Sequence, residues 1–258
     1  MRRIATICFL AAMMLALPAG AQDWKVVRIA VEGAYPPFNE VTKEGKFKGF
    51  DVDIANALCR EMKVDCKLVR QSWDQIQDGL LRKDTDAIVS SLSITPSRRE
   101  RYDFTEKYYH TPAKFVARKG AGIEASPAGL KGRRVGVQRT TTHEAFLVAN
   151  YGGLVEIETF QTLGEATRAL IAGRLDLVLA DSLALAHGFL ESEQGKGFEL
   201  TGPDFTDRRW FGEGVGIAVR KENPELRERF NRALATILVN GTYEKIARQY
   251  FGFNIYGS

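Results

Sequence analysis

The sequence predicts an α/β fold made of two lobes, and three observations support this prediction. Short apolar runs alternate with segments of helical periodicity along most of the chain, which is typical of α/β proteins. Residues 81–91 are similar to residues 171–181 at a constant offset of ninety, and each segment contains a helix end, a turn and a buried strand. Facing lobes explain this echo better than chance similarity between two βα units. A chain of 258 residues is also long enough for two lobes of about a hundred residues each.

Strands are assigned where Val, Ile and Leu cluster, and helices where apolar residues recur every three or four positions. Strands are expected at residues 26–31, 68–69, 86–89, 114–117, 134–137, 156–160, 175–179 and 215–219. Helices are expected at residues 51–62, 74–83, 142–150, 164–172, 182–190, 224–239 and 243–251. The first of these helices places Ile54, Leu58 and Met62 on one face, and Gly241 ends the helix that begins at Pro224.

The first 21 residues have the three parts of a cleavable secretory signal: two arginines, an apolar run over residues 4–17 and small residues at 19–21. The alternative, a membrane anchor, is disfavoured because about 14 apolar residues are fewer than the ~20 that span a bilayer. Cleavage after Ala21 removes Arg2 and Arg3 and lowers the formal net charge from +4 to +2. Such a balanced charge argues against nucleic-acid binding.

The expected mature chain keeps two of the three cysteines, Cys59 and Cys66. Because an exported protein reaches an oxidising compartment, these two residues are expected to form a disulfide rather than a metal or redox site. Two free buried thiols are the alternative.

A polar cluster follows the strand expected at residues 86–89. Ser90, Ser91 and Ser93 come next, and Arg98 lies in the first turn of a following helix. Hydroxyls, free backbone N–H groups and a guanidinium can bind a carboxylate. The echo places Asp181 at the corresponding strand end of the second lobe, where ligands of open α/β sheets bind. The alternatives are an ordinary turn with a solvated Arg98 and a helix N-cap at Asp181.

The run Ser-Ser-Leu-Ser-Ile-Thr-Pro-x-Arg at residues 90–98, with the flanking 86–89 and 104–105, resembles the periplasmic substrate-binding proteins for polar amino acids. Within this family the chain most resembles the lysine/arginine/ornithine and histidine binders, over nearly the whole expected mature sequence. The resemblance implies a venus-flytrap fold with two lobes, each a mixed sheet flanked by helices, and two hinge crossings. Lobe 1 would comprise residues 22–110 and 213–258, lobe 2 residues 111–212, and the hinge would lie near 110–112 and 206–214. The family also carries a cystine at the place of the two cysteines.

A free amino acid presents a carboxylate and an ammonium, and each buried charge needs a partner. Arg98, with Ser93 and the helix start at Thr141 and Thr142, is expected to bind the carboxylate, and the resemblance gives Arg98 this role. Asp181, helped by Ser91, is expected to bind the ammonium, and the family has an aspartate there. A plain capping cluster is the alternative at residues 140–144.

The ligand side chain is expected to meet Glu32, Tyr35 and Trp73, because two aromatic faces and a carboxylate suit a flat cation. Core packing is the alternative for the two aromatic residues. The resemblance favours arginine here, since the lysine/arginine/ornithine binders have aspartate and phenylalanine in place of Glu32 and Trp73. An opine is the alternative ligand, although opine binders tend to have smaller residues at positions 90 and 91.

Two further residues complete the predicted site. Gln138 and His143 either touch the ligand or only support the helix start beside them, and both interpretations remain open. His110 and His187 are expected to be structural or surface residues.

The resemblance implies a periplasmic monomer that captures a cationic amino acid and delivers it to the membrane permease of an ABC importer. Arginine is favoured, with lysine, ornithine and histidine as further ligands, and no cofactor or metal is expected. The same fold occurs in periplasmic dehydratases that act on prephenate-like acids, so an enzyme is the competing hypothesis. The sequence contains no Gly-x-Ser-x-Gly, His-Glu-x-x-His or phosphate-binding glycine motif, which favours a binding protein.

Overall fold

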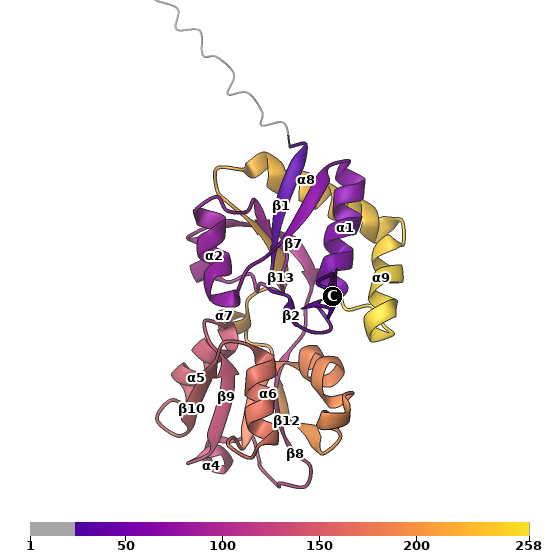
Figure 1. Ribbon diagram of the computed structural model, residues 1–258. Helices are drawn as coiled ribbons and strands as arrows, with labels where there is room; N and C mark the ends of the chain where they lie inside the picture. Colours follow the sequence, from indigo (N-terminus) through magenta and orange to yellow (C-terminus); the bar gives the residue numbers. More distant parts are fainter. Residues whose placement is uncertain (1–23, 258) are drawn as a thin grey trace, which may run out of the picture.

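The computed structural model describes residues 24–257, so the predicted signal at residues 1–21 lies outside the described part of the chain. Two lobes are arranged one above the other in Figure 1, each with its own sheet and flanking helices. The chain passes between them after β7 and again after β12. Among residues 24–257, no helix is both long enough and apolar enough to cross a membrane.

The sheet of the upper lobe in Figure 1 has the strand order β5-β1-β6-β13-β7. Its strands are β1 (Val26–Val31), β5 (Asp65–Arg70), β6 (Ala87–Ile88), β7 (Asp103–Tyr109) and β13 (Val215–Val219). Strand β1 is parallel to β5 and β6, whereas β13 is antiparallel to β6 and β7. The helices of this lobe are α1 (Phe50–Met62), α2 (Trp73–Leu81), α3 (Pro96–Arg99), α8 (Pro224–Val239) and α9 (Thr242–Phe251). A small antiparallel sheet is formed by β2 (Ala34–Tyr35), β3 (Asn39–Val41) and β4 (Phe47–Lys48).

The sheet of the lower lobe has the order β10-β9-β11-β8-β12. Its strands are β8 (Ala113–Arg118), β9 (Arg134–Gln138), β10 (Glu156–Phe160), β11 (Leu177–Asp181) and β12 (Phe198–Phe205). The helices are α4 (Pro127–Leu130), α5 (Thr142–Tyr151), α6 (Leu163–Ile171), the π-helix η1 (Ala184–Leu190), the 3-10 helix η2 (Glu193–Gly195) and α7 (Arg208–Phe211).

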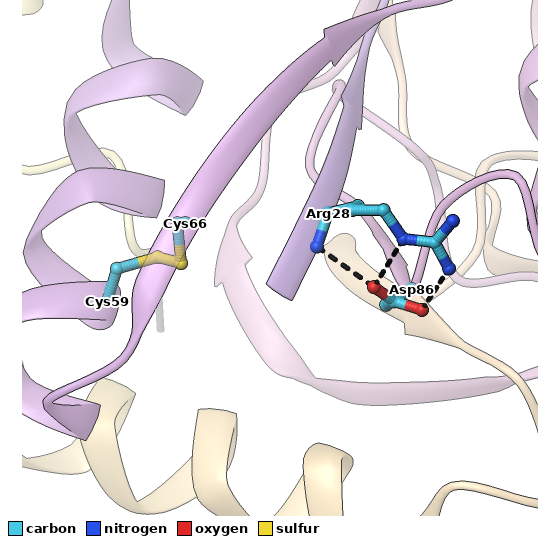
Figure 2. Close-up of a disulfide and its surroundings, with 4 residues drawn as sticks. All are labelled: Arg28, Cys59, Cys66 and Asp86. Carbon is cyan, nitrogen blue, oxygen red and sulfur yellow. Dashed lines mark hydrogen bonds and ion pairs between the residues drawn. A yellow bond between two sulfur atoms is a disulfide. The ribbon is translucent and has the colours of Figure 1, made fainter. Parts of the chain in front are cut away.

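The two sheets have the same order and the same strand directions. Strand β9 is parallel to β10 and β11, and β8 is antiparallel to β11 and β12, as in the upper lobe. A matching arginine–aspartate pair links two neighbouring strands in each sheet. Arg28 of β1 binds Asp86, which lies just before β6 (Figure 2), and Arg134 of β9 binds Asp176, which lies just before β11. The two-lobed α/β fold and the ninety-residue echo are therefore confirmed, whereas the division at residues 110–112 and 206–214 stays a prediction.

The residues of β1 show why each lobe forms layers. Val27, Ile29 and Val31 are fully buried in the same apolar cluster as Ile54 and Leu58 of α1. Side chains alternate between the faces of a strand, so the intervening Ala30 packs with α2 residues in a second cluster. Fully burying a Val, Leu or Ile side chain contributes about 1.5–3 kcal/mol, so helices on both faces stabilise the central strands.

The predicted disulfide is confirmed. Cys59 near the end of α1 and Cys66 in β5 are bonded, with 6.1 Å between their Cα atoms (Figure 2). The bond links a helix to the edge strand of its own lobe.

Several element predictions were incomplete. Strand β5 extends beyond the expected residues 68–69, and the expected helix at 182–190 continues as a π-helix from Ala184. Strand β7, in which polar residues interrupt the apolar ones, was not predicted, nor was β12, in which Gly202 and Pro203 accompany a shift of register. The short strands β2–β4, which are two or three residues long, were not predicted either.

Candidate functional site

The predicted ligand residues come together between the lobes. All of them except Asp181 line one pocket; they are Glu32, Tyr35, Trp73, Ser90, Ser91, Ser93, Arg98, Gln138, Thr141, Thr142 and His143. Asp181 lines an adjoining pocket, which shares Tyr35, Ser91, Ser93, Thr142 and His143 with the first. The two cavities are therefore neighbouring parts of one site.

The fold explains this convergence. In the upper lobe, Glu32 follows β1, the serines follow β6, and Trp73 begins α2. In the lower lobe, Gln138 ends β9 and Asp181 ends β11. The carboxyl ends of parallel strands meet at one edge of a sheet, so both sheets direct these residues to the same region.

Arg98 is a buried cation without an anionic partner in the described part of the chain. Its residue is only 8% exposed, and its Nη1 donates to the carbonyl of Ser93 at 2.9 Å. The guanidinium carbon lies 5.9 Å from the ring centroid of Trp73. Burial lowers the pKa of Arg98 from its usual value, because the charged form is removed from water. An anion entering the cavity would supply the missing charge.

Glu32 is a buried acidic residue, opposite to Arg98 in charge. It is 4% exposed, and its Oε1 accepts a hydrogen bond from Nε2 of Gln138 at 2.7 Å. No positively charged side chain within residues 24–257 pairs with it. Burial raises the pKa of Glu32 to about 7, although the bond from Gln138 acts in the other direction. A cationic group in the cavity would favour its ionised form.

Asp181 is held by three donors. Its Oδ1 accepts from the backbone N–H groups of Leu183 (2.9 Å) and Ala184 (3.1 Å), and its Oδ2 accepts from the hydroxyl of Thr111. Burial raises the pKa of Asp181 to about 6. The capping role and the position beside the ligand cavity therefore hold for the same residue.

The turn after β6 has an unusual backbone that is fixed by a hydrogen bond. Ser91 has a φ of 52°, in the left-handed region that non-glycine residues rarely adopt. Its hydroxyl donates at 2.9 Å to Oδ2 of Asp51, a fully buried residue of α1. Asp51 was not among the residues predicted to belong to the site. The neighbouring Ser90 hydroxyl accepts from the backbone N–H of Glu32 at 3.0 Å.

The start of α5 supplies the lower-lobe side of the cavity. Thr141 caps the helix by accepting from the N–H of Glu144 (3.2 Å), and its hydroxyl donates to the carbonyl of Gln138 (2.7 Å). Burial and the nearby charge of Arg98 lower the pKa of His143 to about 4, so this ring is neutral at pH 7. Because the imidazole is neutral, it adds no second positive charge beside Arg98, and an anionic ligand would pair with the guanidinium.

The aromatic residues have two roles at once. Tyr35 and Trp73 line the cavity, and both also belong to apolar clusters of the upper lobe. The indole N–H of Trp73 is buried without a hydrogen-bond partner. Core packing and cavity lining are thus not exclusive for these two residues.

The lobes also touch each other directly beside the cavity. Gln138 of the lower lobe binds Glu32 of the upper lobe, and Arg139 binds Asp74 at the start of α2 with 2.9 Å from Nε to Oδ1. Gln138, whose role the sequence leaves open between ligand contact and support of the helix start, has Glu32 of the other lobe as a hydrogen-bond partner. These contacts join the two lobes beside the cavity.

Other cavity residues were missed. His110 and Thr111, in the crossing after β7, line the cavity of Asp181 together with Phe211. His110 had been expected to be structural or at the surface. The sequence did contain a signal for these residues, because the predicted hinge lies beside the strand ends that form the site.

Comparisons with known proteins agree with this architecture. The model of the bacterial extracellular solute-binding proteins, family 3, matches residues 27–253. The chain is 47% identical to an L-arginine-binding protein of Pseudomonas aeruginosa, with 100% of both chains covered. It is 38% identical to a lysine/arginine/ornithine-binding periplasmic protein of Escherichia coli, with 90% of each covered.

A solved structure is also similar. It is a periplasmic binding protein of Salmonella typhimurium described as having high arginine specificity, with a TM-score of 0.81 and 29% identity. The match covers 88% of this chain and 99% of that one. From the fold, the site and the family match, the chain belongs to the bacterial extracellular solute-binding proteins of family 3.

Proposed function

We propose that this protein captures a cationic amino acid, with L-arginine as the preferred ligand, in the periplasm. The observation that carries the proposal is the pair of buried ionisable residues, Arg98 and Glu32, that line one cavity without partners of opposite charge among the described residues. Because isolated buried charges are costly, such a cavity is best stabilised by a ligand that supplies both missing charges.

Each charged group of arginine has a partner in this proposal. The α-carboxylate binds Arg98 and the start of α5, the α-ammonium binds Asp181, and the guanidinium binds Glu32 between Tyr35 and Trp73. The names of the relatives support this choice, since they bind L-arginine or lysine, arginine and ornithine. A planar guanidinium can also form two parallel hydrogen bonds with a carboxylate, which an ammonium cannot.

Binding and closure are coupled in this account. The ligand first contacts the upper lobe, and the lower-lobe groups then complete its charge pairing as the lobes close about residues 110–112 and 206–214. A ligand shifts this equilibrium only by its differential affinity for the closed state. The closed form then delivers the amino acid to the permease of an ABC importer. No chemical step is involved, and the binding functions of the relatives support this view.

A thermal-shift screen of the purified protein tests the proposal. L-Arginine, L-lysine, L-ornithine, L-histidine and octopine are compared, with L-glutamate as the control of opposite side-chain charge. Ligand at 100 times its dissociation constant adds about 2.7 kcal/mol to the free energy of unfolding. L-Arginine is expected to give the largest rise in Tm, and no rise with any of the cationic ligands would refute the proposal.

The competing hypothesis, a dehydratase, has its own test. Incubation of the protein with prephenate is expected to give no product above the rate without protein. Catalysed loss of water and carbon dioxide from this substrate, which gives phenylpyruvate, would overturn the non-enzymatic assignment.

A further inference from the structure

The crossing at residues 110–112 does more than join the lobes, because it also borders the cavity of Asp181. His110 and Thr111 both line this cavity. Neither was among the predicted ligand residues, and the proposed function places both in the hinge without giving either a role toward the ligand.

Hydrogen bonds fix this crossing on both sides. Toward the upper lobe, the backbone N–H of His110 donates to the carbonyl of Ile255 at 3.1 Å. Toward the lower lobe, the backbone N–H of Ser182 donates to the carbonyl of Pro112 at 2.9 Å. Thr111 lies between the two anchors, so the position of its side chain is set by both lobes.

The hydroxyl of Thr111 donates to Oδ2 of Asp181, whereas the other carboxylate oxygen accepts only backbone N–H groups. Thr111 is therefore the one side-chain donor to Asp181 in the described residues. A donor to a carboxylate favours its ionised form and opposes the effect of burial, which raises the pKa of Asp181. It also removes rotational freedom from the carboxylate before a ligand arrives.

We infer that Thr111 is a positioning residue for ligand recognition, whose hydroxyl holds the carboxylate of Asp181 in the orientation that receives the α-ammonium group. This inference rests on the proposed function and deepens it. Because Thr111 belongs to the crossing, the orientation of the ammonium partner is tied to the conformation of the segment that joins the lobes.

The test is a double-mutant cycle with L-arginine affinity measured by calorimetry. Thr111→Val keeps the shape of the side chain and removes the donor, and it is expected to weaken binding about tenfold, as for one hydrogen bond to a charged group. Thr111→Ser keeps the hydroxyl and is expected to bind within twofold of the wild type. In an Asp181→Asn background, Thr111→Val is expected to change the affinity less than twofold, because the carboxylate that the hydroxyl orients is no longer present.

Two results would overturn the inference: unchanged affinity of Thr111→Val, or the same tenfold loss in the Asp181→Asn background, which would indicate a general effect on the hinge. Thr111→Ala repeats the cycle if the valine variant does not fold. A wild-type protein that binds no cationic amino acid would instead refute the proposed function itself, so the two failures are distinguishable.

Discussion

The two lobes have the same strand order, but the segments at the ends of their central strands carry opposite charges. In the upper lobe, the central strand β6 is followed by a serine-rich turn and the cation Arg98. In the lower lobe, the corresponding strand β11 ends at the anion Asp181. The shared topology determines where the site lies, whereas the residue types at equivalent strand ends determine which ligand group each lobe binds.

The lobes also differ in what they add around these charges. The upper lobe contributes Glu32 and the aromatic residues, so it holds most of the groups suited to the ligand side chain. The lower lobe adds the start of α5 and Gln138, which reaches across to Glu32. Under the proposed function, this asymmetry predicts that the ligand binds first to the upper lobe and that the lower lobe then closes over it.

Removing the charge of the upper lobe is expected to have the largest effect. Arg98→Ala leaves the ligand carboxylate without its buried cation, which costs about 3 kcal/mol or more and weakens L-arginine binding at least a hundredfold. Arg101→Ala is the matched control, because Arg101 is exposed and pairs with Asp78. Calorimetric titration of both variants checks the difference. Wild-type affinity in Arg98→Ala would remove this residue from the site.

Removing the charge of the lower lobe is expected to have the next largest effect. Asp181→Asn should weaken L-arginine binding some tenfold to a hundredfold, because the ammonium loses a charged acceptor. The control is Asp176→Asn, since Asp176 lies before the same strand but pairs with Arg134 outside the site. Equal dissociation constants for the two variants would contradict the assignment of Asp181.

Glu32 is expected to make binding depend on pH. Its pKa of about 7 lies above its ordinary value, whereas a bound guanidinium requires the ionised form. L-Arginine affinity should therefore rise about tenfold or more from pH 5.5 to pH 8. Glu32→Gln should flatten this rise and leave the smaller part contributed by Asp181. A pH profile identical to that of the wild type would argue against a role for Glu32.

In the ligand-free protein, Glu32 has the opposite dependence on pH: its contribution to the free energy of unfolding falls as the pH rises. A raised pKa in the folded state means that the folded protein binds the proton more tightly than the unfolded chain. Its contribution, on the order of 3 kcal/mol, is present below pH ~4.5 and is lost as the pH rises through about 7. Urea unfolding without ligand at pH 5 and pH 8 checks this trend, with Glu32→Gln as the reference.

The disulfide is expected to affect binding least. Cys59→Ser with Cys66→Ser should lower the free energy of unfolding by about 2.5 kcal/mol, the loop-entropy value for so short a loop. Cys66 lies near the start of β5, whereas the site lies beyond the strand ends, so the affinity for L-arginine should change less than twofold. A large loss of affinity at unchanged stability would contradict this separation.

Much of this arrangement could be predicted from the sequence, because local patterns report local structure. The buried strand before Ser90 and its echo before Asp181 placed these residues at corresponding strand ends. The same pattern placed Glu32 after a strand, and it placed Trp73 and Arg98 at the beginnings of helices that follow strands. The acidic and basic types of Glu32 and Arg98 then indicated the charges of the ligand.

Contacts between distant segments could not be predicted in this way. The bond from Gln138 to Glu32 joins two lobes, and the sequence contains no periodicity that reports such a pairing. Thr111 lies in an irregular crossing where neither strand nor helix pattern applies, so its contact with Asp181 became visible only in three dimensions. Strands β7 and β12 were missed for a related reason, because sheet pairing overrides their weak local patterns.

Calorimetric titration with L-arginine, agmatine and L-citrulline tests most directly whether the lobes supply complementary charges for one enclosed ligand. Agmatine lacks only the carboxylate, and citrulline lacks only the side-chain charge. We expect L-arginine to bind in a 1:1 complex and each analogue to bind at least about a hundredfold more weakly, as expected when a buried charge loses its partner. Equal affinity for L-arginine and either analogue would contradict the account.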